Sequence, residues 1–481
     1  MRTGALVCVS CALVSGCAVG PNYVRPEVPL TEAFRDAPEG ATAASIADLP
    51  WWELFHDDAL RALIEEALEG SGDLRAATER VAAARARAHA ARDALLPSLT
   101  IQALAQRQRI PFVPTFSGLP TLTTNEFTAS INVSWELDVW GAIRRAAEAA
   151  SADYLAVVEQ KRGVILILVA DVAQAYVELL ELDALYDLNE ETLRSRRELL
   201  ALYTAQMTEG TGTMVQTANA ESLVYQVEAL LPQLRAQLAQ KENQITTLLG
   251  RPPGPIPRGP PLDLAELPEV PPGLPATLLA RRPDVMTLEQ NLRSAMAQIG
   301  VADAALLPPI NLTGLAGLLT PEISTFFHGS QGEWLYGAST SWLAPVLGGD
   351  SLLDNRDAAI ATANAAAASY RQAVVQALAD VADALAGIQS AREVAERLSL
   401  QVDALKTQTR LTMDQYRVGT ASYVEVNLAV TNLLSAQIAL VQARAQRSIS
   451  VIQLYRALGG GWANPLRPES SQEIEDSRPR P

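Results

Sequence analysis

The sequence predicts a mainly helical protein with a small β part, built from two copies of one design. Long segments rich in Ala, Leu, Glu and Arg contain almost no Gly or Pro, which favours helices. Residues Glu126–Leu137 alternate apolar and polar side chains, which is typical of a strand with two different faces. Short motifs also recur at an offset near 210 residues. A two-faced strand in such a chain needs an apolar surrounding, either a soluble core or a lipid bilayer around a water-filled barrel.

Composition and charge narrow the class of protein. The chain is 48% hydrophobic but only 5% aromatic, so small aliphatic side chains do the packing, which suits helix–helix contacts better than a β-sandwich. A formal charge of −16 without basic clusters argues against nucleic acid or an anionic membrane surface as a partner. The charge leaves open the alternative of an acidic interior or mouth that favours cations.

The N-terminus has the features of a secretory signal at residues 1–16. Arg2 supplies the positive charge, Ala5–Val14 the apolar stretch, and Val14–Cys17 resembles a bacterial lipobox. That resemblance implies cleavage before Cys17, a diacylglycerol on its thiol and an acyl chain on its amine. Several acyl chains would anchor the protein stably. The alternative is an ordinary secretory signal with a chance cysteine.

Cysteine usage agrees with export. Cys8 and Cys11 would leave with the signal, so Cys17 would be the only cysteine of the mature chain and no disulfide is expected within it. Ala18 follows instead of Asp, which in the enterobacterial sorting pattern implies the outer membrane. We find no run of about 18 or more apolar residues after the signal, so the sequence predicts no transmembrane helix.

The elements of the first repeat follow in order along the chain. A Pro-rich lipidated arm is expected at 17–50, and the repeat itself at 51–249. Its helical region breaks near Gly70–Gly72, with Asp73 as the expected N-cap. The rest of the repeat is expected as strands at about 98–108 and 126–137, a long helix at 143–208, a tip at 209–213 and a returning helix at 214–249.

The second repeat follows a Pro-dense connector at 250–275, which excludes helix and central strand. The repeat is expected at 276–461, with strands at about 310–319 and 334–343, a long helix pair and a tip at 418–422. Residues 462–481 form a charged, Pro-rich tail that we expect to be disordered.

Four strands cannot close a barrel, and open strand edges are not tolerated in lipid. We therefore expect several copies to share one barrel, and a trimer would give twelve strands. Aromatic residues stand where interfacial girdles would need them. They are Phe112, Phe116, Trp140, Phe326, Phe327, Trp334 and Trp342. The alternative is that they form the core of a soluble hairpin.

Several motifs, spread over the mature chain in one order, carry a family resemblance. They are Cys17 with Pro21–Pro26, Trp51–Phe55, Ala94–Pro97, Trp135–Gly141, Leu279–Val285, Ile299-Gly300 through Pro308, and Tyr416–Gly419. The run Arg282–Val285 is particularly characteristic. The chain resembles the TolC-type outer membrane factors, and within them the NodT/OprM-like lipoproteins that serve resistance–nodulation–division (RND) efflux pumps.

This resemblance implies a homotrimer with a twelve-stranded β-barrel in the outer membrane and a twelve-helix α-barrel in the periplasm. A periplasmic adaptor would hold the helix tips and connect them to an inner-membrane RND pump. The protein would export small molecules, such as drugs and toxic compounds, as a passive conduit. Its only covalent addition would be the lipid on Cys17.

The resemblance also assigns two sets of site residues. The adaptor-docking tips would be Gly210, Thr211, Gly212, Gly419, Thr420 and Ala421. The periplasmic gate would involve Tyr416 and Glu425, with Asp414 and Asp380 as weaker candidates. The chain departs from the family at Leu428, where many relatives have Asp, and at Ala421, where some have Arg. An exposed, solvated Glu425 without a gate role is the alternative.

The sequence lacks the residue patterns that enzyme active sites need. His56, His89 and His328 are far apart in sequence, without the paired spacing of a metal site. No phosphate-binding loop or nucleophile elbow is present either. Two other functions stay open besides efflux, namely a type I protein secretion conduit and a non-conducting coiled-coil spacer lipoprotein.

Overall fold

The computed structural model describes residues 18–29, 57–110, 122–260, 281–325, 332–341 and 350–460. The chain forms two compact units that cut across the sequence repeats. Unit 1 comprises the described residues within Met1–Glu27, Arg80–Val158 and Thr287–Arg371. Unit 2 comprises those within Val28–Glu79, Glu159–Met286 and Gln372–Pro481.

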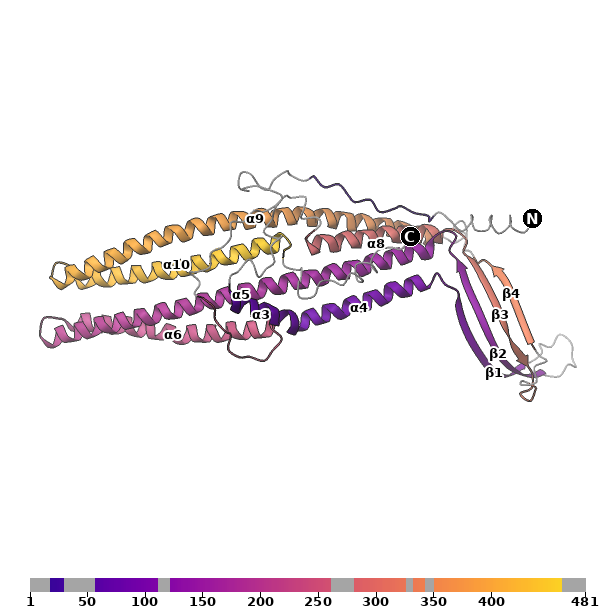
Figure 1. Cartoon of the computed structure of the whole chain (residues 1–481), viewed down its shortest axis with the longest axis horizontal. Helices are drawn as coiled ribbons and strands as arrows, with labels where there is room; N and C mark the ends of the chain where they lie inside the picture. The colour runs from indigo at the N-terminus through magenta and orange to yellow at the C-terminus, as the bar shows by residue number, and fades with distance from the viewer. Residues whose placement is uncertain are drawn as a thin grey trace. The chain divides into compact units, whose positions relative to one another are not determined.

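Unit 1 contains one antiparallel sheet of four strands (Figure 1). The strands are β1 (Ser98–Ile110), β2 (Leu122–Leu137), β3 (Ile310–Thr320) and β4 (Gly332–Ser339), in the order β1-β2-β3-β4. All four were expected from sequence, and β2 begins four residues before its expected start. The pairing of β2 with β3 joins the two repeats into one sheet, with Ile131 opposite Ala316.

The register gives this sheet two different faces. Residues directly opposite each other share a face. One face carries apolar side chains that are all exposed in the single chain, namely Leu99, Ile101, Ile131, Val133, Trp135, Trp334 and Tyr336. The opposite face carries polar side chains, among them Gln102, Gln106, Glu126, Asn132 and Thr313. The alternation predicted for Glu126–Leu137 is confirmed. It extends only in part to the neighbouring strands, because Leu104, Leu315 and Leu335 also lie on the polar face.

Unit 1 also contains the helical segments next to the sheet. They belong to α4 (Gly72–Asp93), α5 (Ala142–Thr208), α8 (Pro283–Ala305) and α9 (Asp350–Arg417). Ala295 and Ile299 of α8 pack against Ala363 of α9 in a small apolar cluster. Such small side chains allow helix axes to approach closely, as the composition indicated.

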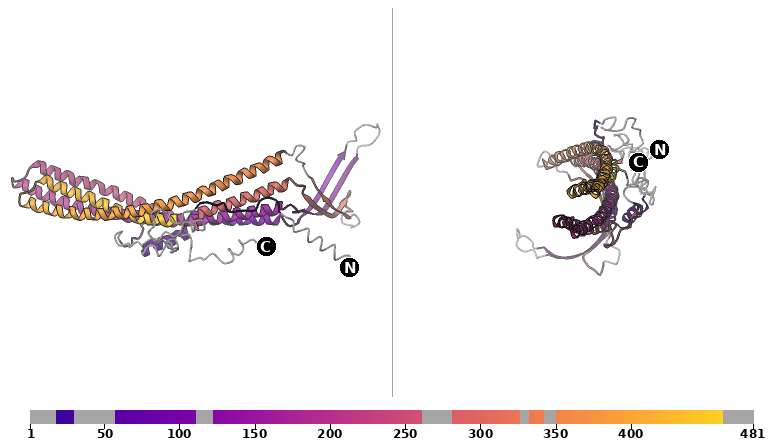
Figure 2. Two further views of the ribbon diagram at one scale, coloured as in Figure 1. Left: turned by 90° about the horizontal axis from the view of Figure 1, so that it is seen from above. Right: turned by 90° about the vertical axis from the view of Figure 1, so that its left-hand side faces the viewer.

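Unit 2 is helical. It contains α3 (Asp58–Gly70), most of α5 and α9, α6 (Met214–Leu248) and α10 (Tyr423–Ala457). Helices α5 and α6 form one hairpin and α9 and α10 form another, and their turns lie at the same end of the unit (Figures 1 and 2). Helices α5 and α9 run for 67 and 68 residues, which confirms the expected long helices.

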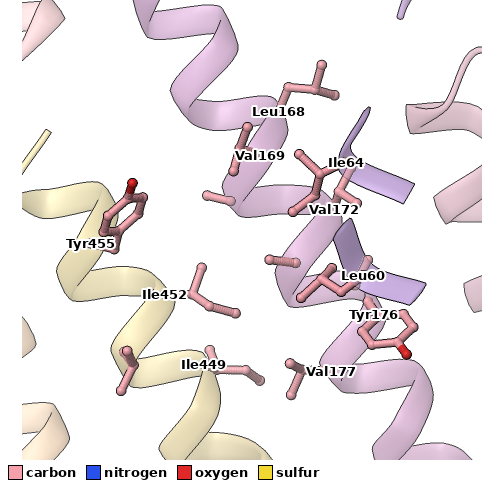
Figure 3. Packing of buried hydrophobic residues seen from close by; sticks show 14 of the residues in the cluster. Leu60, Ile64, Leu168, Val169, Val172, Tyr176, Val177, Ile449, Ile452 and Tyr455 are labelled. Carbon is pink, nitrogen blue, oxygen red and sulfur yellow. The ribbon is translucent and has the colours of Figure 1, made fainter. Parts of the chain in front are cut away.

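The core of unit 2 lies around α5, with α3 on one side of it and α10 on the other (Figure 3). Leu60 and Ile64 of α3 contact Val172 and Tyr176 of α5, and Ile452 of α10 belongs to the same cluster. Each such side chain contributes roughly 1.5–3 kcal/mol when fully buried. Helix α3 begins at an ordinary N-cap, where the Asp57 carboxylate accepts from the Ala59 N–H at 2.8 Å.

The N-cap of α4 differs from the sequence-based expectation. Helix α4 already begins at Gly72, and the Ser71 hydroxyl accepts from the Leu74 N–H at 3.4 Å, so Ser71 and not Asp73 occupies the N-cap position. Asp73 instead lies in the first turn, where a carboxylate interacts favourably with the helix dipole. Helices α5 and α10 each contain a stretch that is long and apolar enough to cross a membrane by length and composition only, so the expected absence of a transmembrane helix stays a prediction. Within the described residues, 56% of the stretch in α5 and 22% of the stretch in α10 is buried.

Some predicted residues lie outside the described part of the chain. They are Cys17, His56, Phe112, Phe116, Phe326, Phe327, His328, Trp342, most of the lipidated arm and the C-terminal tail. Of the expected girdle aromatics that the structure describes, Trp334 is exposed and stacks on Tyr336 with ring centroids 5.6 Å apart. Trp140 donates its indole N–H to the Pro308 carbonyl at 2.9 Å.

Candidate functional site

The two helical turns of unit 2 have the same backbone geometry. Gly210 has φ +76° and Gly419 has φ +79°, a conformation that only glycine adopts without strain. The Gln206 carbonyl accepts from the N–H groups of Thr211 and Gly212 at 2.9 and 2.8 Å. In the second turn the equivalent Gln415 carbonyl accepts in the same way from Thr420 and Ala421. This shared pattern explains why these glutamines and glycines recur in the sequence.

Side chains reinforce both turns. The Thr211 and Thr420 hydroxyls each donate at 3.1 Å to the same glutamine carbonyl that accepts the backbone bonds. Capping boxes then start the returning helices, with Thr213 and Gln216 in the first turn and Ser422 and Glu425 in the second. The turns are therefore well-defined structures.

One difference between the turns follows from a single methyl group. The Ala421 nitrogen lies 3.3 Å from the Gln415 carbonyl oxygen, whereas the equivalent Gly212 nitrogen lies 2.8 Å from the Gln206 carbonyl oxygen. A Cβ on Gly212 would stand 2.9 Å from the Met207 nitrogen, so a side chain here needs extra room. The second turn provides that room by lengthening this bond.

Tyr416 connects the two hairpins next to the turns. Its hydroxyl donates to the Gln206 side-chain oxygen at 2.9 Å, which joins α9 to α5. Its ring packs edge-on against Tyr203, with centroids 6.0 Å apart, and Tyr203 packs edge-on against Tyr423 at 4.8 Å. Aromatic pairs in this geometry stabilise by about 0.5–1.5 kcal/mol beyond their burial. Leu199, Ala220 and Val426 complete this cluster, which we call the tip cluster.

Arg196 makes a second connection between the hairpins. Only 4% of it is exposed, and its guanidinium donates to the Asn427 side-chain oxygen at 3.2 Å and to the Thr431 hydroxyl at 2.9 Å. Both acceptors are on α10, and both are neutral. Burial lowers the pKa of the Arg196 guanidinium, whose two hydrogen-bond partners among the described residues carry no charge. Burial likewise raises the pKa of the Tyr203 hydroxyl, which keeps that phenol uncharged.

Glu425 is exposed in the single chain and acts there as a helix cap. Its carboxylate accepts from the Ser422 N–H at 2.6 Å, and its own N–H donates to the Ser422 hydroxyl at 3.3 Å. The hydrogen bond from the Ser422 backbone, followed by that from its hydroxyl, lowers the pKa of the Glu425 carboxyl. The carboxylate is therefore ionised at neutral pH and fixed at the start of α10.

The weaker candidates are not part of the tip cluster. Asp414 forms an exposed ion pair with Arg417 at 3.4 Å, next to the second turn. Asp380 instead pairs with Arg282 at 2.9 Å, and Arg282 also donates to the Ala457 carbonyl. Asp380 thus helps to hold the end of α10 in place. No group of three or more His, Cys, Asp or Glu is arranged to hold a metal within the described residues.

Sequence reasoning located both turns, and the structure places Tyr416 beside them, whereas its gate role stays a prediction. The partners of these residues were missed. Gln206 was noticed only as a repeated residue, although its side-chain oxygen accepts a hydrogen bond from the Tyr416 hydroxyl. Arg196 and Tyr203 were missed altogether, because a single Arg or Tyr within a long helix has no local signature. Exposed apolar side chains surround the turns, and they are Met214, Val215, Val418, Val424 and Leu428.

Comparisons with known proteins agree with this geometry. Residues 63–251 and 274–460 match the model of the family described as outer membrane efflux protein. The probable efflux pump outer membrane protein TtgC of Pseudomonas putida is 33% identical over 460 residues, covering 94% of both chains. The cation efflux system protein CusC of Escherichia coli is 30% identical over 459 residues, covering 95% of this chain and 98% of CusC. The open state of the MtrE outer membrane channel of Neisseria gonorrhoeae superposes with a TM-score of 0.83 at 31% identity, over 93% of this chain and 99% of MtrE.

Proposed function

The chain belongs to the outer membrane efflux protein family, and we propose that it works as a lipid-anchored homotrimer whose helical tips receive a periplasmic adaptor. It is a TolC-type outer membrane factor, the outer membrane channel of a tripartite efflux pump, and not an enzyme. Trimer, lipid anchor, adaptor docking and gate are the parts that we propose.

The proposal of a trimer rests on the open sheet of unit 1. β1 and β4 are its outer strands, and within the described residues each pairs with only one neighbour. The apolar face of the sheet is exposed, which suits lipid outside a barrel with a polar lumen. If β4 of each copy pairs with β1 of the next, a three-fold ring closes and no edge is left.

The tip cluster supports a gate. The Tyr416–Gln206 and Arg196–α10 contacts hold the two hairpins of one chain together, and Glu425 would form an acidic ring under three-fold symmetry. The exposed apolar residues around Gly210–Gly212 and Gly419–Ala421 provide a surface for an adaptor. The conduit is passive, and an inner-membrane RND pump supplies the energy.

The cargo class follows from the relatives. TtgC is described as an efflux pump protein and CusC as a cation efflux protein, so we propose small molecules as the substrates of this channel. The lipid on Cys17 would place the protein at the outer membrane, with its helices in the periplasm.

The test is a mass determination on the detergent-solubilised full-length protein and on a Cys17→Ala variant. We expect a trimer in both, with the lipid mass lost only in the variant. Conductance in a planar bilayer would then separate a channel from a spacer protein, which should show none. A monomer in both proteins would leave four strands unable to close and would refute the shared barrel.

A further inference from the structure

Two arginines lie on the apolar face of the sheet in unit 1. The register pairs Arg107 with Asn125 and Arg109 with Thr123, so both arginines share a face with Leu99. Both side chains are exposed in the single chain. A cation on the lipid-facing side of a strand is costly at the bilayer midplane and tolerated near the headgroups. The position of these two residues, which we call the arginine pair, therefore decides what they can do.

The arginine pair lies at the end of the sheet that is far from the helices. β1 begins five residues after α4 ends, so Leu99 lies at the helical end of the strand and the arginine pair at the other end (Figure 1). At about 3.4 Å per residue and a strand tilt of roughly 40°, the height above Leu99 is about 21 Å for Arg107 and about 26 Å for Arg109. The apolar band of outer-membrane barrels is about 25 Å tall. The arginine pair thus stands at the far boundary of that band, where lipid headgroups begin.

The sheet sorts its charges by face. The four strands carry three carboxylates, and the register puts all of them on the face opposite to the arginine pair, namely Glu126, Glu136 and Glu333. The segment that follows β1, residues 111–121, contains no Asp or Glu. Glu322 comes two residues after β3, and its carboxylate accepts from the Ser324 hydroxyl at 3.4 Å. The strands therefore offer the arginine pair no carboxylate on its own face.

This sorting changes the sign of the charge that the apolar face presents to lipid. The formal charge of −16 argued against an anionic membrane surface as a partner of the whole chain. Exposed charges further apart than the Debye length, about 8 Å at physiological ionic strength, are largely screened, so the local charges decide at this place. The cross-strand neighbours Asn125 and Thr123 are uncharged. An anion bound here would meet two cations and no repelling carboxylate of the same sheet face.

We propose that the arginine pair binds the phosphate groups of lipopolysaccharide, the glycolipid of the outer leaflet. Arginine suits this ligand because its planar guanidinium donates two parallel hydrogen bonds to one phosphate and stays charged at neutral pH. Arg107 and Arg109 are separated by about 7 Å along the strand, so each guanidinium can hold a phosphate of its own. Three copies would place six guanidinium groups around the barrel at the level of the headgroups. The inference rests on the proposed shared barrel with its helices in the periplasm.

The test measures binding of lipid A, the phosphorylated lipid part of lipopolysaccharide, to the purified full-length protein by native mass spectrometry. The first variant is Arg107→Gln with Arg109→Gln, which keeps both side chains polar and exposed. The second is Arg107→Lys with Arg109→Lys, which keeps the charge but loses the paired hydrogen bonds. The matched control is Arg80→Gln with Arg87→Gln, which changes two exposed arginines of α4 in the same unit.

Each protein is titrated with lipid A and, separately, with lipid A from which the phosphates have been removed. The glutamine variant should bind lipid A at least tenfold more weakly than wild type, and the lysine variant should lie between the two. The α4 control should match wild type. Removal of the phosphates should weaken binding to wild type down to the level of the glutamine variant, because only contacts of the acyl chains remain.

Equal lipid A binding by wild type and the glutamine variant would overturn the inference. Equal binding of lipid A with and without phosphates would overturn it too, since acyl chains alone would then hold the lipid on the apolar face. The same loss in the α4 control would show that any exposed arginine attracts lipid A. Planar-bilayer conductance separates these results from failure of the barrel. Normal conductance with any of them refutes only the lipid site, whereas a wild type that neither trimerises nor conducts would overturn the barrel and the lipid site together.

Discussion

The hydrogen bond from Tyr416 to Gln206 gives a direct test of the proposed gate. Tyr416→Phe removes one hydroxyl and keeps the ring that packs against Tyr203, so the tip cluster stays filled. A neutral hydrogen bond of this kind contributes about 1 kcal/mol to the state in which it forms. If closing the channel forms it in all three copies, the variant should lose about 3 kcal/mol of closure energy. Because 1.4 kcal/mol is a factor of ten, the open-to-closed ratio should rise by about a hundredfold.

Planar-bilayer recordings of single trimers measure that ratio directly. Tyr225→Phe is the matched control, since the Tyr225 hydroxyl bonds only to Glu221 on the same helix and joins no two hairpins within the described residues. We expect Tyr416→Phe to raise the open probability and Tyr225→Phe to leave it unchanged. Equal open probabilities for Tyr416→Phe and wild type would refute the gate role of this contact. Equal effects of both variants would show that any lost tyrosine hydroxyl loosens the helices.

Three further predictions concern stability, measured by denaturant unfolding in detergent. Gly419→Ala should lower stability by about 1–2 kcal/mol because φ is +79° there. The control Gly387→Ala lies inside α9 with open space around it and should raise stability by up to about 1 kcal/mol. Equal effects of the two substitutions would contradict this prediction. Burial raises the pKa of the Asp171 carboxyl above 3.8, although the nearby charge of Arg456 acts in the opposite direction. The contribution of Asp171 to stability is therefore complete below pH 3.8 and is lost as the pH rises through the raised pKa. Asp171→Asn should therefore stabilise the protein at neutral pH and flatten this part of its pH profile, and an unchanged profile would refute the assignment. Arg282→Met should cost about 1–3 kcal/mol by breaking the bonds to Asp284, to Asp380 and to the Ala457 carbonyl, and a neutral effect would show that none of these bonds matters.

Patterns that depend on neighbouring residues were predicted well. Alternation along Glu126–Leu137 located β2, and the lack of Gly and Pro located the long helices α5 and α9. Both turns followed from glycines at equivalent places, since a sharp turn between helices needs positive φ. The N-cap of α4 was misplaced by two residues because Ser71 and Asp73 are both good capping residues, and sequence alone does not rank them.

Contacts between distant residues were not predictable in the same way. Tyr416 and Gln206 are 210 residues apart, and Arg145 and Asn22 are 123 apart. Nothing in the sequence near Arg145 distinguishes it from the adjacent Arg144, which instead pairs with Asp138 at 3.0 Å. Only the fold decides which of two neighbouring arginines is buried against the arm.

The two repeats have the same turn but contribute differently to the proposed gate. Gln206 and Gln415 are equivalent, yet within the described residues only the Gln206 side chain accepts a hydrogen bond from the other hairpin. The residue equivalent to Tyr416 in the first repeat is Met207, which has no hydroxyl to donate. This hydrogen bond therefore runs from the second hairpin of a chain to the first, whereas Arg196 of the first hairpin donates to the second. In a closed ring of three chains, opening that separates the hairpins of one chain must break this bond, whereas opening between chains would leave it intact. Tyr416→Phe should accordingly raise the open probability only if the hairpins of one chain separate, so the recordings also identify which helices move.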